Sequence, residues 1–131
     1  MRAGRWWRLS WLPLGLLSLA ACSSGEDEVV DPALAIRGKR AAGKCVACHA
    51  LERRENKVGP HLVGVVGRGV ASVRGYEYSD ALRAQGGVWT AERLRRFLQD
   101  PQAMAPGSRM VVSPMSAAEL DGLVAYLESP L

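Results

Sequence analysis

The chain has 131 residues, of which 17 are basic and 13 acidic, for a formal net charge of +4. This length allows one small domain. Three of the basic residues lie within the first 21 residues, which we expect to be removed, so 14 basic residues face 13 acidic ones in the rest of the chain. A balance of +1 gives no support to nucleic-acid binding, and no nucleic-acid partner is expected.

A secretory signal is predicted for residues 1–21. Three arginines give this segment a positive start, the residues after them are mainly apolar, and small residues end it. The apolar run is too short to span a membrane and is interrupted by Pro13 and Gly15. We therefore expect export and removal of the segment, with a permanent membrane anchor as the alternative.

Cys22 follows the sequence Leu-Ala-Ala, which resembles the lipobox of bacterial lipoproteins. The resemblance implies that Cys22 becomes the lipidated first residue of the mature protein; the alternative is a free or excised cysteine in an ordinary signal peptide. Residues 22–31 are polar and acidic and predict a flexible tether to a folded domain of residues 32–131. The expected location is the periplasmic or extracytoplasmic side of a bacterial membrane.

The first helix is predicted to begin at Pro32, after Asp31 as N-cap, and to run to about Ala47. Gly38 lies inside this helix. A glycine there costs about 1 kcal/mol relative to alanine, so Gly38 either weakens the helix or permits the close approach of another.

The sequence Cys45-Val46-Ala47-Cys48-His49 is typical of covalent haem attachment. Two cysteines on one helical turn point the same way, so both sulfurs can bond one haem while His49 reaches the iron. A dithiol site of thioredoxin type would need β-α-β patterning, which the surrounding sequence lacks. A zinc site is disfavoured because Cys48 and His49 are adjacent rather than spaced for tetrahedral coordination. We therefore predict one covalently bound haem c.

Two segments follow the haem motif. Five glycines between residues 59 and 75 favour an irregular loop over regular structure. Thr90 can cap a helix whose apolar stripe continues until Pro101 ends it.

The C-terminal part combines an irregular segment with a helix. Three prolines and a glycine indicate that residues 101–115 are irregular. Ser116 and Glu119 form a predicted capping box for a last helix that continues until Pro130. Regular structure in the chain is therefore predicted to be mostly α-helical.

Over residues 35–128 the chain resembles the class I cytochromes c, the mitochondrial and bacterial electron carriers. Beyond the haem motif, several short motifs occur in the order of that family: Val58-Gly59-Pro60-His61-Leu62, Gly67-Arg68, Tyr76-Glu77-Tyr78-Ser79-Asp80-Ala81, Trp89, Pro106-Gly107-Ser108-Arg109-Met110 and Leu123-Val124-Ala125-Tyr126-Leu127. The resemblance implies an all-α cytochrome c fold, with three to five helices wrapped around one haem and irregular loops rich in glycine and proline. It also places Gly38 near Tyr126, where the first and last helices cross.

The resemblance further implies which residues hold the haem. The two cysteines of the motif attach it. The carbonyl group of Pro60 binds His49 Nδ1 and leaves Nε2 for the iron. Three donors to a haem propionate are implied: Arg68, Tyr78 and Trp89.

Met110 is predicted to be the second axial ligand. Its Pro-Gly-Ser-Arg-Met context matches the ligand loop of the family, and a soft thioether opposite histidine suits a carrier-type haem. Met104 and Met115 are alternatives, although packing is the usual role of methionine. His61 is a further rival, but the family fold places it on the histidine side of the haem.

Three positions depart from the pattern of the family. Phe97 lies where the family often has a tyrosine near the methionine sulfur, so a hydrogen bond that tunes the potential is missing. Ala42 replaces an aromatic residue that commonly locks the first helix against the last, and Leu82 replaces a polar residue of an internal water network. These departures concern the potential and the stability rather than the function.

Haem iron held by histidine and methionine has no open coordination site, which disfavours substrate chemistry. The resemblance therefore implies a monomeric electron carrier rather than an enzyme. Its redox partners would be membrane complexes such as a quinol-oxidising complex, a terminal oxidase or a photosynthetic reaction centre. Two alternatives remain: a gas-binding or sensor protein with a displaceable Met110 ligand, and a dithiol redox lipoprotein without haem.

A cationic docking rim is predicted around the haem motif. It would guide the exposed haem edge toward an acidic partner through brief, salt-sensitive contacts. A solvated charged surface is the commoner meaning of such a cluster. The predicted rim consists of Lys39, Lys44, Lys57 and Arg109.

Overall fold

The computed structural model describes residues 31–129 of the chain. Its elements follow in the order α1 (Pro32–Ala42), α2 (Asp80–Arg83), α3 (Ala91–Gln99), α4 (Pro101–Met104) and α5 (Ala117–Glu128). Residues 31–129 contain no strand, only an isolated antiparallel bridge between Gly69 and Val88. The predicted all-α fold class is therefore confirmed. The predicted signal, Cys22 and all but the last residue of the tether lie outside the described residues.

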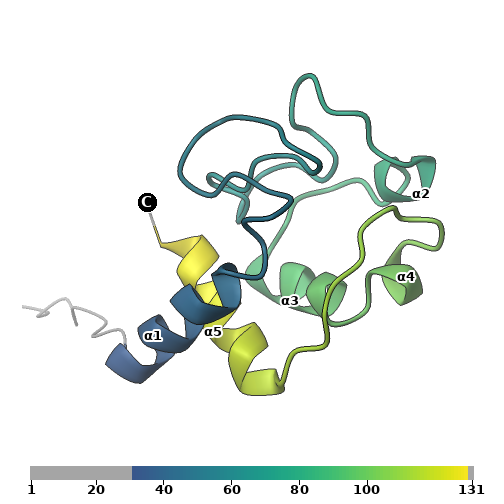
Figure 1. The fold of residues 1–131 in the computed structure, drawn as a ribbon. Coiled ribbons are helices and arrows are strands. Elements are labelled where there is room, and N and C mark those ends of the chain that lie inside the picture. The colour runs from purple at the N-terminus through teal and green to yellow at the C-terminus, as the bar shows by residue number, and fades with distance from the viewer. Residues whose placement is uncertain (1–30, 130–131) are drawn as a thin grey trace, which may run out of the picture.

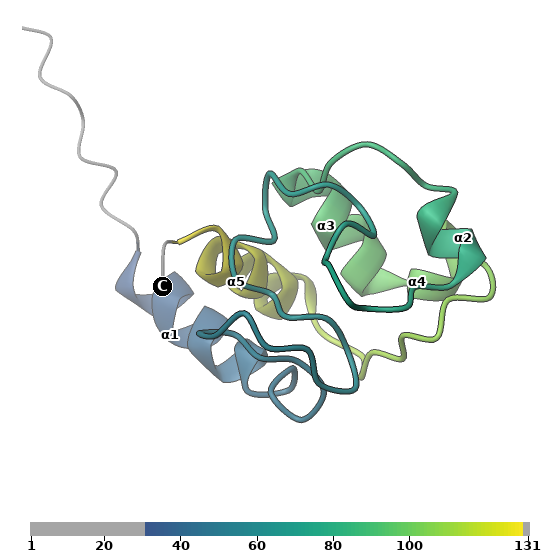
Figure 2. The same ribbon diagram turned by 90° about the horizontal axis from the view of Figure 1, so that it is seen from above.

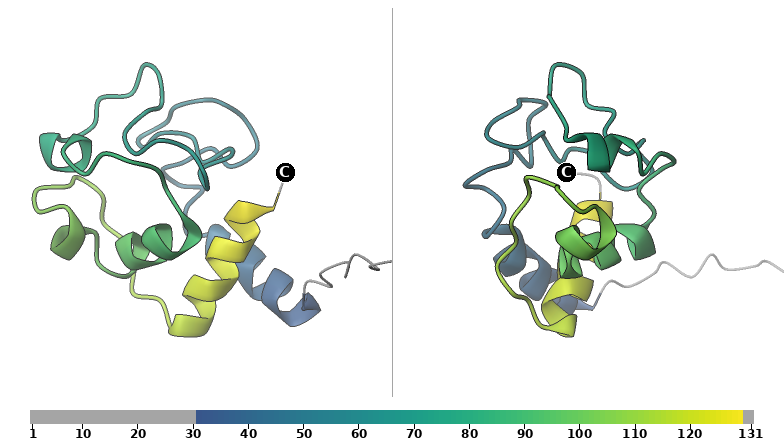
Figure 3. Two further views of the ribbon diagram at one scale, coloured as in Figure 1. Left: turned by 180° about the vertical axis from the view of Figure 1, so that it is seen from behind. Right: turned by 90° about the vertical axis from the view of Figure 1, so that its right-hand side faces the viewer.

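Helices α1, α3 and α5 form one layer, and the loops of residues 43–79 form the other, with α2 at the level of the loops (Figure 1). Figure 1 shows α1 and α5 together at one end of the molecule and α2 and α4 at the other, with α3 between them. The view from above shows the same order along the molecule (Figure 2). The loops of residues 43–79 lie over α1, α3 and α5 when the molecule is seen from behind (Figure 3). None of the helices of residues 31–129 has the length and apolar character needed to cross a membrane.

Helix α1 begins as predicted but ends earlier. Asp31 Oδ1 accepts a hydrogen bond of 2.9 Å from the Ala33 N–H, and Pro32 occupies the first helical position. The helix ends at Ala42 rather than near Ala47, since Gly43 follows and glycine is a poor helix former. The chain continues through turns, so the haem motif lies on a turn of its own.

Helices α1 and α5 cross at two facing glycines. A Cβ atom on Gly38 would lie 2.2 Å from the carbonyl oxygen of Gly122 and 2.9 Å from Tyr126 Cβ. A Cβ atom on Gly122 would lie 2.9 Å from the backbone nitrogen of Gly38. The predicted position of Gly38 near Tyr126 is confirmed, and the close helix approach explains why glycine is present despite its conformational cost. The sequence pattern did not indicate the matching role of Gly122.

Helices α3 and α5 confirm the capping residues predicted for them. Thr90 Oγ1 accepts a hydrogen bond of 3.1 Å from the Arg93 N–H, and α3 ends at Gln99. Ser116 and Glu119 form the capping box at the start of α5. Because these caps satisfy backbone N–H groups that a helix leaves unpaired, they are visible in the sequence alone.

The two short helices α2 and α4 were not predicted. Ser79 caps α2. The prediction that residues 101–115 are irregular is wrong for α4, because Pro101 both follows α3 and fits the first position of a new helix. Asp100 caps that helix by accepting hydrogen bonds from the next backbone N–H groups.

Candidate functional site

A cavity of about 360 Å³ is lined by residues of both layers. Much of its wall is apolar and comes from α3, α5 and the loops, including Leu62, Val65, Leu94, Phe97, Leu98 and Leu127. All residues predicted to hold a haem contribute to this one lining: Cys45, Cys48, His49, Pro60, Arg68, Tyr78, Trp89 and Met110. The fold thus gathers around a single cavity residues that are far apart in the sequence.

The haem motif lies at the cavity on the turn that follows α1. The carbonyl oxygen of Cys45 accepts backbone hydrogen bonds from Cys48 at 3.1 Å and from His49 at 2.9 Å. Burial raises the pKa of the half-buried Cys45 thiol, and the neighbouring Cys48 raises it further. Dithiol redox centres instead use a thiolate of lowered pKa. The environment of Cys45 therefore speaks against the dithiol alternative.

The ring of His49 is held from two sides. The Pro60 carbonyl oxygen lies 2.6 Å from His49 Nδ1, which is the contact that the resemblance implied. Because a carbonyl oxygen only accepts, Nδ1 carries the proton and Nε2 keeps its lone pair for a metal. A Cβ atom on Gly59 would lie 2.3 Å from His49 Cε1, so glycine is needed there to leave room for the ring. The motif around Gly59 was recognised in the sequence, but the need for glycine beside the His49 ring leaves no pattern there.

Arg68 has one buried nitrogen without a partner. Its Nη1 donates to the Val63 carbonyl oxygen and its Nη2 to the His61 carbonyl oxygen, each at 3.0 Å. Its Nε is buried and has no hydrogen-bond partner among the described residues. Burial lowers the pKa of Arg68, so an anionic oxygen beside Nε would offset a desolvation cost. A haem propionate supplies an oxygen of this kind.

Tyr78 and Trp89 complete the polar side of the cavity. Burial raises the pKa of Tyr78, so its hydroxyl group keeps a proton to donate at neutral pH, while the oxygen accepts from the Val73 N–H at 3.3 Å. Trp89 is buried, and its backbone N–H donates to the Arg68 carbonyl oxygen at 2.8 Å. This bond joins two of the three predicted propionate donors. Their roles toward a propionate remain predictions.

The cavity lining distinguishes the three candidate methionines. Met110 lines the cavity, whereas Met104 and Met115 pack against the core and are not part of the lining. His61, the rival ligand, is also outside the lining, and its Nδ1 lies 3.3 Å from Arg68 Nη1. The geometry therefore favours Met110 as second axial ligand, which remains a prediction.

Three cations of the predicted docking rim are bound within the chain. Lys44 pairs with Glu119, with 2.8 Å between Nζ and Oε1. Lys57 donates to the carbonyl oxygen of Val46, and Arg109 to that of Glu77. Lys57 and Arg109 keep their charges because carbonyl groups are neutral, whereas the charge of Lys44 is neutralised by its partner. Lys44 therefore contributes less positive charge to the rim than the sequence predicted.

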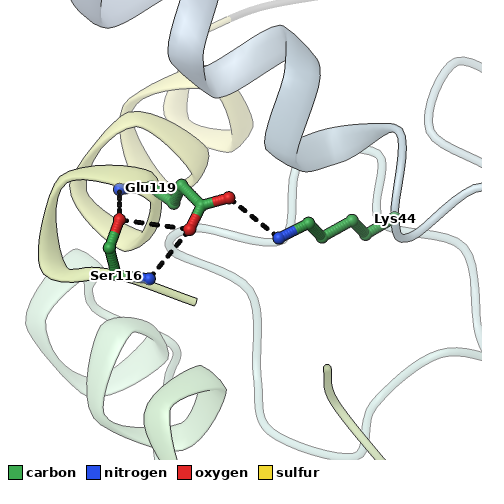
Figure 4. A network of polar contacts seen from close by, with 3 residues as sticks. All are labelled: Lys44, Ser116 and Glu119. Carbon is green, nitrogen blue, oxygen red and sulfur yellow. Dashed lines mark hydrogen bonds and ion pairs between the residues drawn. The ribbon is translucent and has the colours of Figure 1, made fainter. Parts of the chain in front are cut away.

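Glu119 joins the start of α5 to the haem motif. One carboxylate oxygen, Oε2, accepts from the Ser116 N–H at 2.8 Å, and the other accepts from Lys44, which directly precedes Cys45 (Figure 4). Lys44 and the Ser116 donors lower the pKa of Glu119 to about 2. The sequence indicated the capping box but not the contact with Lys44, which links residues 75 positions apart.

These features fit a covalently attached haem. The cavity has apolar walls for a macrocycle, two thiols on one turn, a histidine with a free Nε2 and a buried arginine nitrogen that lacks an acceptor. A methionine of the same lining offers a thioether sulfur.

Comparison with known proteins gives a consistent result. The family model for cytochrome c matches residues 35–130. Cytochrome c-550 of Ancylobacter novellus is 43% identical over 98 residues, covering 71% of this chain and 92% of that protein. Cytochrome c2 of Agrobacterium tumefaciens (strain II Chrys) is 44% identical over 96 residues, covering 70% and 86%. The solved structure of cytochrome cH from Methylobacterium extorquens matches with a TM-score of 0.64 and 40% identity, covering 71% of this chain and 95% of that one.

Proposed function

This chain belongs to the cytochrome c family, and on that basis we propose that it carries single electrons between membrane redox complexes from a lipid-tethered position. Membership establishes the coarser part: the protein transfers electrons, is not an enzyme and binds one covalent haem c. The observation that carries the proposal is a cavity with mainly apolar walls that is lined by all eight residues predicted to hold the haem.

Each of these residues has a defined task in the proposal. Cys45 and Cys48 form the covalent attachment, and His49 and Met110 provide the axial ligands. When bound, the haem supplies a one-electron Fe(III)/Fe(II) couple. The soft Met110 sulfur and the apolar walls favour the reduced state, which implies a relatively high potential. Because His49 and Met110 would be the ligands in both oxidation states, little has to rearrange when an electron arrives.

The cavity also has an exposed apolar margin suited to brief contacts. Val58 and Val111 line the cavity and are 76% and 92% exposed, and the exposed Cys48 lines the same cavity. Lys57 directly precedes Val58, and Arg109 lies two residues before Val111. We propose that partners dock at Val58, Val111 and Cys48, guided by these two cations, through a small, salt-sensitive interface.

The tether would restrict the carrier to a membrane surface. A lipid on Cys22 and a coil of about ten residues allow a reach on the order of 20 Å, which suits partners in the same membrane. A quinol-oxidising complex as donor and a terminal oxidase or photosynthetic reaction centre as acceptor fit this arrangement. Replacing Cys22 with serine should move the haem absorbance from the membrane fraction to the soluble fraction; if the absorbance stays with the membranes, the tether proposal fails.

The function is tested by optical spectroscopy of the full chain expressed in a bacterium with haem-attachment machinery. We expect covalent haem and, in the oxidised protein, the weak near-infrared charge-transfer band between methionine sulfur and iron. Met110→Ala should abolish this band. Met104→Ala is the matched control and should preserve it, because Met104 lies outside the cavity lining.

Two results would contradict the carrier proposal. Covalent haem without the band in the unaltered protein would mean an open or differently ligated iron. Tight binding of carbon monoxide by the reduced protein at neutral pH would show that the methionine is displaceable. Either result would favour the gas-binding alternative. Phe97 is consistent with that alternative, because it lines the cavity without the hydroxyl group that a tyrosine would offer to the methionine sulfur.

A further inference from the structure

The segment of residues 85–88 leads from the end of α2 to Trp89 and has an unusual backbone. Gly86 and Gly87 are consecutive residues with positive φ angles of 53° and 70°. Only glycine adopts such angles at low cost. Two left-handed residues in succession turn the chain sharply and leave the carbonyl groups of the segment outside any helix or strand, so their hydrogen-bond donors must come from elsewhere.

The side chain of Arg93 supplies most of those donors. Its Nη1 donates to the carbonyl oxygen of Gly86 at 2.7 Å and to that of Val88 at 3.4 Å. Its Nη2 donates to the carbonyl oxygen of Gln85 at 3.0 Å. The remaining carbonyl group, that of Gly87, accepts from the Val70 N–H at 2.9 Å. One side chain therefore binds three of the four carbonyl groups of this segment.

The geometry leaves room for Arg93 specifically. A Cβ atom on Gly87 would lie 2.9 Å from Arg93 Nη1, so a larger residue at position 87 would push the guanidinium group away. Arg93 lies in the first turn of α3, where its backbone N–H is already fixed by the cap at Thr90. The side chain thus projects from a fixed anchor into the turn of the preceding segment.

Arg93 also contacts the side chain that this segment delivers to the cavity. Its Cζ lies 5.6 Å from the centroid of the Trp89 ring, over the ring face, which is a cation–π arrangement. Phe97, one turn further along α3, packs against the same ring with 5.0 Å between centroids and 47° between planes. The Trp89 ring is therefore in contact with two side chains of one helix while it lines the cavity.

Two neighbouring arginines on α3 behave differently. Arg95 pairs with Asp121, and Arg96 pairs with Glu92 one turn away at 3.8 Å. Both are ion pairs with exposed carboxylates, which contribute little. Arg93 has no carboxylate partner among the described residues and bonds to backbone carbonyl groups instead.

We infer that Arg93 is a positioning residue for the haem site. Its planar guanidinium group fixes both the turn of residues 85–88 and the indole ring of Trp89. It thereby holds the indole N–H of Trp89 in place for the cofactor. The inference rests on the proposed binding of haem and adds a residue outside the cavity lining to the residues that organise it. Lysine cannot replace Arg93 in this role. Its ammonium nitrogen is one compact centre, without the planar fork that lets Nη1 and Nη2 reach separate carbonyl groups while the guanidinium plane lies over the ring.

The test is hydrogen exchange of the Trp89 indole N–H in the reduced haem-bearing protein, followed by NMR. Its resonance is identified by its loss in Trp89→Phe. We expect exchange to be about tenfold faster in Arg93→Gln, as expected for the loss of hydrogen bonds that each contribute modestly. Arg93→Lys should exchange nearly as fast as Arg93→Gln although it keeps the charge. Arg96→Gln is the control and should leave exchange unchanged.

Every outcome decides the question. Unchanged exchange in a haem-bearing Arg93→Gln variant overturns the inference, and full restoration by Arg93→Lys shows that charge rather than positioning is responsible. If Arg93→Gln does not fold, Arg93→Lys carries the test alone, because the inference requires faster exchange there too. Absence of covalent haem from the unaltered protein would instead overturn the proposed function, so the two failures are distinguishable.

Discussion

At the scale of single residues, the haem motif depends on close contacts with residues that carry none of its chemistry. The spacing of Cys45, Cys48 and His49 identifies the haem motif, because covalent attachment demands those residue types in that order. The role of Gly59 depends on how closely a loop passes the His49 ring, and the role of Arg93 depends on where three carbonyl groups converge. Such distances arise from tertiary packing and leave no pattern in the linear sequence.

Gly59→Ala should disturb the axial ligand without touching it. The added methyl carbon would lie 2.3 Å from the His49 ring, so either the ring or the loop must move. We expect a loss of about 1–3 kcal/mol in the free energy of unfolding, typical of overpacking. The near-infrared band of the oxidised protein should also weaken. Thermal unfolding and optical spectra measure the two effects.

Gly64→Ala is the matched control for this substitution. Gly64 has a φ angle of 62°, so alanine is strained there, but a Cβ atom would meet no other atom within 4 Å. The control should therefore lose some stability and keep its spectrum. An unaltered spectrum in Gly59→Ala would show that the His49 ring tolerates the methyl group and that the loop absorbs the change.

At the scale of elements, helices with side-chain caps were predictable and short helices were not. Asp31, Thr90 and Ser116 satisfy the first N–H groups of α1, α3 and α5, and all three starts were predicted. Helices α2 and α4 have only four residues each and lack the apolar periodicity that identifies a longer helix. Contacts between elements, such as that of Lys44 with Glu119, join segments whose proximity only the fold creates.

The Lys44–Glu119 contact predicts a defined pH dependence of stability. The pKa of Glu119 is lowered in the folded protein from 4.5 to about 2, mainly by Lys44. A lowered pKa means that the ionised group stabilises the fold above pH 4.5 and loses this effect as the pH falls toward 2. Glu119→Gln should therefore be less stable than the unaltered protein at pH 7, and the difference should vanish near pH 2.

Chemical denaturation at pH 7, at intermediate pH and near pH 2 measures this difference. The pair is exposed, so the effect at pH 7 should be small and should shrink further in high salt. Glu128→Gln removes the same charge at the other end of α5 and is the control. A stability difference for Glu119→Gln that persists unchanged down to pH 2 would assign the effect to lost capping rather than to the ion pair.

At the scale of the whole molecule, the architecture depends on what fills the cavity. Among the described residues, α1 packs against α5, and α3 packs against α5 and α4, whereas the long stretch of residues 43–90 contains only the four-residue helix α2. The resemblance to a family made the gathering of these loops around one cavity predictable. Helical periodicity alone could not predict this arrangement, because residues 43–79 contain no regular element. They pack instead through side chains that join the hydrophobic core.

Removal of the haem should therefore abolish cooperative folding. A cavity with mainly apolar walls that lacks its occupant exposes those walls to water and forfeits their packing contacts. The loss falls on a domain whose entire stability is ordinarily about 5–15 kcal/mol. Expression in a host without haem-attachment machinery should yield a chain with reduced helical circular dichroism and no sharp urea transition. Under the dithiol alternative, the same preparation would be folded and thiol-active, because that chemistry needs only Cys45 and Cys48. Under that alternative, the loops over the cavity should resist proteolysis even without haem. Under the haem proposal, we expect the haem-free chain to be cleaved rapidly within residues 43–79 and more slowly in α5.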